Sequence, residues 1–259
     1  MTTEFPVVIN LAITFFAVFL IGISKAGFGG GVGLLTTPLL SLIYPAKFAV
    51  GFLLPLLIVA DVFTLYHHRG HWDIANLKRL IPASIVGILA GSFFMHSISD
   101  FYLKKFIGVV VLIFVMVHLF RLIQSVEDNQ VKPRGWVGGL VGVAAGFVST
   151  AAHSAGAIIA MYLLPQKLSK RVFVSTMVLF FALVNLFKVI PYISIQLITI
   201  ESLKAGIWFI PLIPLGTLTG AWLNKRISQA AFTRIILILV LITGIQLLLD
   251  KNIFTLLLR

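Results

Sequence analysis

The sequence predicts an all-α polytopic membrane protein made of two inverted five-segment repeats, with short broken or re-entrant helix pairs near the membrane midplane. Hydrophobic residues make up 59% of the 259 positions, charged residues make up only 11%, and the mean hydropathy is +1.09. A soluble domain of this length cannot bury so much apolar surface, so lipid must be the solvent for most of the chain. Apolar segments of membrane-helix length recur in two halves.

Ten apolar segments are separated by charged residues, prolines and glycines. They cover residues 5–24, 28–43, 46–66, 79–96 and 103–123 in the first half, and 135–149, 152–164, 171–191, 203–223 and 231–249 in the second. Only Glu4 is charged before the first segment, so we expect a retained helix rather than a signal peptide. A polar stretch near the midpoint predicts three regions: a first repeat (1–124), a cytoplasmic linker (125–134) and a second repeat (135–259).

The two halves align at residues that lie 124 positions apart. Gly22 aligns with Gly146, Lys47 with Arg171 and Asp61 with Asn185, and after a five-residue difference in one loop Pro82 aligns with Pro211, Gly87 with Gly216 and Gly91 with Gly220. The last two pairs form matched GxxxG motifs, which let helix backbones approach closely in lipid. Because each repeat has an odd number of segments, we expect the second repeat to lie upside down relative to the first.

The loop charges agree with this inversion. Thirteen basic residues fall on one side of the predicted membrane and six on the other, while Lys188 lies within a segment. The richer side is assigned to the cytoplasm, which places both termini outside a bacterial inner (plasma) membrane. Basic residues scattered between apolar runs do not form a nucleic-acid surface, and without cysteine the chain has neither a disulfide nor a thiolate metal site.

Two segments of the second half are short. Residues 135–149 and 152–164 number only 15 and 13, whereas a helix needs about 20 residues to cross a hydrocarbon core of about 30 Å. We interpret this pair as half-helices that dip in and return, or as broken helices. We interpret residues 28–43, which contain several glycines and Pro38, in the same way. Ten full crossings stay open as the alternative, because the charge count is the same for both.

Each pair contains a turn of small and polar residues that we predict to bind an anion. The candidates are Lys25, Gly27, Gly29, Gly30, Gly31, Thr36 and Thr37 in the first turn, and Ser149, Thr150, His153 and Ser154 in the second. Glycines expose backbone N–H groups, and a helix that begins at such a turn presents its positive end. Two such helix ends that converge near the midplane would form an anion site. The alternatives are helix packing for the glycines and snorkelling of Lys25 to the membrane surface.

Two ionisable residues are candidates for proton coupling. His153 and Asp61 fall inside apolar segments, where ionisable groups are costly unless they are paired or wet. The alternatives are a neutral, hydrogen-bonded His153 and a salt link between Asp61 and a nearby lysine. Lys188, which precedes Pro191 by three residues, is expected to snorkel to the surface.

A histidine cluster between the third and fourth segments is a weaker candidate. His67, His68 and His71 lie beside Arg69 and Asp73 in a hydrophilic stretch. We expect a solvated cytoplasmic loop here rather than a metal site. The sequence therefore predicts neither a metal nor a cofactor.

Two motifs carry a resemblance to a known family. The first repeat reads Gly27-Phe-Gly-Gly-Gly31 followed by Leu34, Leu35, Pro38, Leu39 and Leu40, and the second keeps Gly146, Ser149 and Tyr162-Leu-Leu-Pro165. With these motifs the chain resembles, over essentially its whole length, the TauE/SafE sulfite-exporter family, also called the 4-toluene sulfonate uptake permease family. The resemblance implies transport of sulfite, sulfonates or related organosulfur anions. It also implies that Gly27, Gly29, Gly30 and Gly31 lie on the substrate path. Residues 152–157 depart from the glycine- and proline-rich stretch of family members, which leaves the exact substrate open.

These observations favour a secondary transporter of a small anion, most directly sulfite or an organosulfonate, coupled to protons and working by alternating access. Its expected partners are the anion and the lipid bilayer, with a homodimer as an open alternative. An anion channel, and an intramembrane enzyme or assembly factor, are the competing classes. We expect no enzyme, because the sequence has no close pair of intramembrane carboxylates, no His-x-x-x-His motif and no metal cluster.

Overall fold

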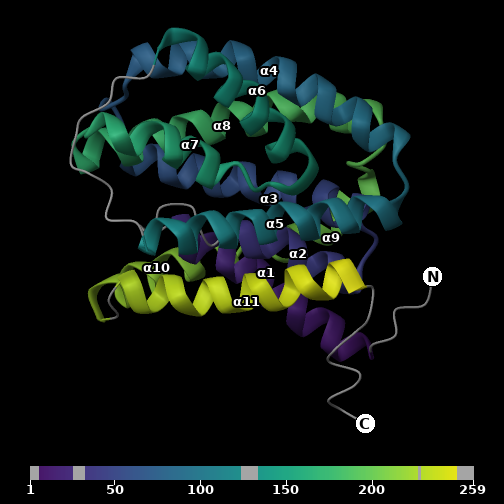
Figure 1. Cartoon of the computed structure of the whole chain (residues 1–259). Helices are drawn as coiled ribbons and strands as arrows, with labels where there is room; N and C mark the ends of the chain where they lie inside the picture. Colours follow the sequence, from purple (N-terminus) through teal and green to yellow (C-terminus); the bar gives the residue numbers. More distant parts are fainter. Residues whose placement is uncertain (1–5, 26–32, 124–133, 227–228, 250–259) are drawn as a thin grey trace.

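The computed structural model describes residues 6–25, 33–123, 134–226 and 229–249, and within these ranges the chain is helical with no strand. The helices are α1 (Val7–Lys25), α2 (Gly33–Ile43), α3 (Ala46–His67), α4 (Ile74–Ser97), α5 (Asp100–Ile123), α6 (Gly135–Ala152), α7 (Gly156–Leu163), α8 (Lys170–Ser194), α9 (Ile200–Ile207), α10 (Leu212–Arg226) and α11 (Gln229–Leu249), with one 3₁₀ turn, η1 (Leu164–Gln166). Figure 1 shows the long helices side by side, with α4 and α6 along one edge, α11 along the opposite edge, and α3 and α8 between them.

Most of these helices fit the length of a membrane. Within the described ranges, α1, α3, α4, α5, α6 and α8 are each long and apolar enough to cross, and the bent pair α9–α10 would add a seventh span. Large apolar side chains point outward from several of them, among them Val8, Phe93, Ile190 and Trp208. Such a surface is stable only in lipid, so the chain is a multi-pass integral membrane protein.

Helix α3 lies at the centre of the bundle. Ala49 and Leu53 on one side of α3 belong to an apolar cluster with buried residues of α1 and α2. Val50 and Leu54 on the other side belong to a cluster with residues of α5, α6 and α8. A helix buried on both sides is apolar all round, which explains why α3 carries almost no polar residue before Asp61.

The prediction that residues 135–149 are too short to cross was wrong. Helix α6 has 18 residues, because Thr150 and two alanines continue it beyond Ser149 to Ala152. The hydroxyl group of Thr150 donates to the carbonyl of Gly146, which lets this polar side chain stay within a helix. The helix ends at His153, whose φ is 51°, and the following helix α7 is only eight residues long. Each pair thus combines one long and one short helix, and re-entry of α2 and α7 stays a prediction.

The segment predicted at 203–223 is also not one continuous helix. It divides into α9 and α10, which meet at an angle of 51°. Pro211 and Pro214 lie three residues apart at this break, so two backbone N–H donors are missing within one turn. In the first half, α4 contains only Pro82 and continues through it.

Two helix pairs that link the halves have matching contacts. Gly22 of α1 lies against the backbone of α10 at Gly216, so closely that a Cβ on either residue would overlap the other helix. In the same way Gly146 of α6 lies against the backbone of α4 at Ser84, and a Cβ on Gly87 would overlap the backbone of α6. The first and fourth segments of each half thus pack on the fourth and first segments of the other. A duplication predicts this reciprocal packing, and the duplication itself stays a prediction.

Candidate functional site

An ion pair between a partly buried lysine and a buried aspartate joins α1 to α3. Lys25, the last residue of α1, forms a salt bridge with Oδ1 of Asp61, and the exposed fractions of the two side chains are 14% and 3%. The other carboxylate oxygen, Oδ2, accepts a hydrogen bond of 2.6 Å from Nδ2 of Asn185 on α8. Both oxygens of Asp61 are therefore paired, as a carboxylate buried among apolar helices requires. Of the alternatives for Asp61, the salt link to a nearby lysine is the one observed.

The contact between Asp61 and Asn185 joins two positions that the alignment of the halves made equivalent. They are 124 residues apart and their side chains touch. If the halves are related by a pseudo-two-fold axis, equivalent residues can touch only close to that axis. For inverted repeats the axis lies in the membrane plane, so the predicted repeat places this contact near the midplane.

Lys188 is the second lysine of the site, and it is fully buried. It lies on α8 one turn beyond Asn185, and its exposed fraction is 0%. Its ammonium nitrogen donates to three acceptors: the carbonyl of Ser149 at 3.2 Å, the hydroxyl oxygen of Ser149 at 3.1 Å and Nδ1 of His153 at 3.0 Å. The expectation that Lys188 snorkels to the surface was wrong, because these acceptors at the end of α6 hold it inside the bundle.

His153 connects three elements through its two ring nitrogens. Nε2 lies 3.0 Å from the carbonyl oxygen of Val50 on α3, and Nδ1 lies 3.0 Å from the ammonium group of Lys188. A carbonyl only accepts, so Nε2 carries the proton and donates, while Nδ1 accepts from the lysine. The ring is then neutral. Its left-handed backbone both ends α6 and directs the imidazole towards α3.

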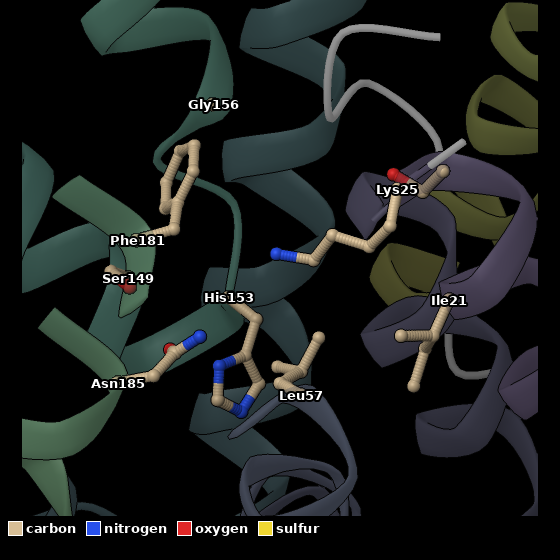
Figure 2. A pocket seen from close by; sticks show the side chains of 9 residues that line it. Ile21, Lys25, Leu57, Ser149, His153, Gly156, Phe181 and Asn185 are labelled. Atoms are coloured by element: carbon tan, nitrogen blue, oxygen red, sulfur yellow. The ribbon is translucent and has the colours of Figure 1, made fainter. Parts of the chain in front are cut away.

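These side chains border a pocket between α1, α3, α8 and the turn that follows α6 (Figure 2). The pocket is lined by Ile21, Ser24, Lys25, Leu57, Ser149, His153, Gly156, Phe181 and Asn185. In Figure 2 the Lys25 side chain reaches from α1 across the pocket towards His153 and Asn185 on the opposite wall. Gly156 is the first residue of α7, so the positive end of this helix also borders the pocket. The pocket combines cationic and hydrogen-bonding groups with an apolar wall.

The charges of the site do not cancel. Among the described residues, it contains the ammonium groups of Lys25 and Lys188 and the single carboxylate of Asp61. Residues 26–32, which follow Lys25 in the sequence, include no ionisable side chain. With both lysines and Asp61 ionised and His153 neutral, the charges of these side chains sum to one positive.

The predicted site residues fall into three groups. Lys25, Ser149 and His153 line the pocket, and Asp61 holds Lys25 at its edge. Four others are buried without lining it: Thr36 and Thr37 in α2, Thr150, and Ser154, whose hydroxyl group donates to a backbone carbonyl. Gly27, Gly29, Gly30 and Gly31 lie outside the described residues, so their role stays a prediction.

Sequence reasoning missed three residues on one face of α8. Phe181 and Asn185 line the pocket, and Lys188 anchors its wall. These residues are spaced by four and three positions, which places them on the same side of a helix. The spacing therefore indicated that the three residues share a face. The other residues of α8 are largely apolar on every side, so the sequence did not show which face points inward.

The histidine loop is separate from this site. Asp73 accepts a hydrogen bond from the backbone of Asn76 and so begins α4, while His71 contacts the carbonyl of Arg69. In the part of the chain that the structure describes, no three His, Cys, Asp or Glu side chains are placed to hold a metal ion.

Comparison with curated proteins and with solved structures gave no match. A family model described as sulfite exporter TauE/SafE matches residues 14–247, which is nearly the whole chain. The matched range contains Lys25, Lys188, Asp61 and the whole lining of the pocket. The protein therefore belongs to the TauE/SafE sulfite exporter family.

Proposed function

We propose that the protein is a secondary transporter that carries a small anion, sulfite or an organosulfonate, across the bacterial inner membrane through the pocket beside Lys25. The observation that supports this most is the pair of lysines, one partly and one fully buried, that are balanced by a single carboxylate. An excess positive charge in a low-dielectric interior is costly, and a bound anion would neutralise it. A cation or a neutral substrate would leave that charge uncompensated.

The groups around the pocket suit an oxyanion with a small apolar part. The Lys25 ammonium group, the Ser149 hydroxyl group and the Asn185 amide supply donors. Leu57 and Phe181 supply an apolar wall against which an alkyl or aryl group can pack. Sulfite would use the donors alone, whereas an organosulfonate would use both parts.

Proton coupling follows from competition at Lys25. The anion and Asp61 both need this ammonium group, and Asp61 now holds it. While an anion is bound, Lys25 would be shared between the anion and the Asp61 carboxylate. A proton that reaches Asp61 in another step of the cycle would weaken its hold on Lys25, which would couple proton movement to anion movement. The pocket lies between helices of both halves, and rocking of one half against the other would open it to each side in turn.

Counterflow in proteoliposomes tests this proposal. Vesicles loaded with unlabelled sulfite, methanesulfonate or 4-toluenesulfonate should accumulate the same labelled anion, with saturation. Lys25→Gln should abolish the exchange, because the charge that binds the anion is gone. Lys78→Gln, which removes an exposed lysine of α4, is the matched control and should exchange normally. No exchange of any of the three anions would contradict the proposal, and flux that neither saturates nor responds to the internal anion would indicate a channel.

A further inference from the structure

We propose, on the basis of the transport function above, that the pocket selects anions by valence. It takes anions with one negative charge in preference to those with two, and Lys188 sets this limit as a fixed charge that does not contact the anion. The geometry of the two lysines leads to this division of roles.

Lys188 has no free donor for an anion. An ammonium group has three N–H bonds, and three acceptors surround this one: two oxygens of Ser149 and Nδ1 of His153, at 3.0 to 3.2 Å. The side chain is fully buried and does not line the pocket. It therefore contributes its charge and holds the pocket wall in position, but it is not a ligand.

Lys25 has the opposite character. It lines the pocket, its side chain is partly exposed, and its described ionic partner is the one carboxylate of Asp61. Its ammonium group can be shared with or transferred to an incoming anion without breaking a set of three hydrogen bonds. Lys25 is thus the ligand, and Lys188 is the background charge.

The charge balance then fixes the preferred valence. Lys25, Lys188 and Asp61 sum to one positive charge, and the neutral His153 adds nothing. A monovalent anion makes the site neutral, whereas a divalent anion leaves one buried negative charge without a partner. In a low-dielectric interior that difference is large compared with the small changes in size and shape among oxyanions.

Methanesulfonate and sulfate are the probes that test this inference. Both have a tetrahedral sulfur with charged oxygens, and at neutral pH they carry one and two negative charges. The wild type should bind methanesulfonate more tightly, although its apolar wall would also favour the methyl group. The decisive measurement is how the ratio of the two affinities changes in variants that alter the charge and keep the shape, measured by thermal stabilisation and by competition with counterflow.

Two isosteric exchanges at the contact of Asp61 with Asn185 provide those variants. Asp61→Asn raises the site to two positive charges and should shift the affinity ratio towards sulfate by about tenfold or more. Asn185→Asp lowers the site to zero and should weaken methanesulfonate by a similar factor. The double exchange Asp61→Asn/Asn185→Asp restores one positive charge and should restore the wild-type preference, which a merely structural role of either residue would not produce.

Lys188→Met tests the background charge. It should weaken methanesulfonate although Lys188 does not line the pocket, and Lys170→Met, at the exposed start of the same helix, should not. If Lys188→Met fails to fold, the two exchanges at Asp61 and Asn185 still decide. An unchanged affinity ratio in Asp61→Asn, or a wild type that exchanges sulfite but binds neither probe, would overturn the inference while leaving transport intact. A wild type that binds neither probe and exchanges none of the three anions of the counterflow assay would overturn the transport function itself.

Discussion

His153 holds α3, the end of α6 and α8 in register through a ring that is hydrogen-bonded on both nitrogens. A proton on Nδ1 would remove the acceptor that Lys188 uses and would place two cations against each other. Titration of this one ring would therefore release Lys188 from the pocket wall. This makes His153 the second candidate for proton coupling beside Asp61.

We expect His153→Ala to flatten the pH dependence of transport, because it removes the ring that we propose to carry the coupling proton. The measurement is the initial rate of labelled anion uptake into proteoliposomes across a series of pH values. His153→Gln is the matched variant, since its amide can donate to Val50 and accept from Lys188 without titrating. It should retain more flux than the alanine variant with the same flat profile. A pH profile like that of the wild type in both variants would exclude coupling through His153.

Helices α4 and α6 cross each other at close distance where glycines lie at the contact. Gly146 faces the backbone of Ser84, and a Cβ there would meet three backbone atoms that cannot rotate away. Gly139 lies on the same helix two turns earlier, and a Cβ there would meet nothing within 4 Å. Substitution at Gly146 therefore tests the packing of α6 against α4, whereas substitution at Gly139 tests helix propensity alone.

Gly146→Ala should destabilise the protein by about 1–3 kcal/mol, because the two helices must move apart. Gly139→Ala should be neutral or stabilising by up to about 1 kcal/mol, because alanine is the better helix former. Thermal unfolding of the purified variants in the same detergent measures both. Equal stability of the two variants would show that α4 and α6 are not in close contact at Gly146.

The distribution of basic residues predicts the orientation of the protein in the membrane, and the arrangement of the helices is compatible with it. The start of α1 and the end of α11 lie at the same end of the bundle in Figure 1, as they must if both termini are on one side of the membrane. Inversion of the halves also predicts that α3 and α8 run in opposite directions across the membrane. The end of α3 and the start of α8 should therefore face the cytoplasm, and the start of α3 and the end of α8 should face the outside.

Cysteine labelling can test this orientation without removing any native cysteine, since the chain has none. Exposed positions Ser99 and Ser194 should react with a membrane-impermeant thiol reagent from outside the cell when replaced by cysteine. Arg69→Cys and Lys170→Cys, also at exposed positions, should react only after the membrane is opened. Labelling of all four from one side would contradict the predicted inversion and the assignment of the cytoplasmic side.

The sequence predicted the outline of this molecule because that outline rests on properties of short segments. Hydropathy and length placed the helices, and the helical membrane fold and the family are confirmed. The spacing of 124 residues identified Asp61 and Asn185 as equivalent, and the structure shows that they touch. Glycine and proline positions predicted the helix ends and bends less accurately, since α6 extends to Ala152 and the segment at 203–223 is bent.

The sequence by itself determined that the chain lies in lipid and where its helices run, because transfer into lipid depends on the composition of each segment alone. Only the tertiary structure decided which face of each helix points inward. In a soluble protein the polar face reveals this, but in a membrane both the lipid and the core are apolar, so periodicity carries little information. For this reason Lys188 was expected at the surface and instead lies beside His153. The grouping of two lysines with one carboxylate became visible only when α1, α3, α6 and α8 were assembled.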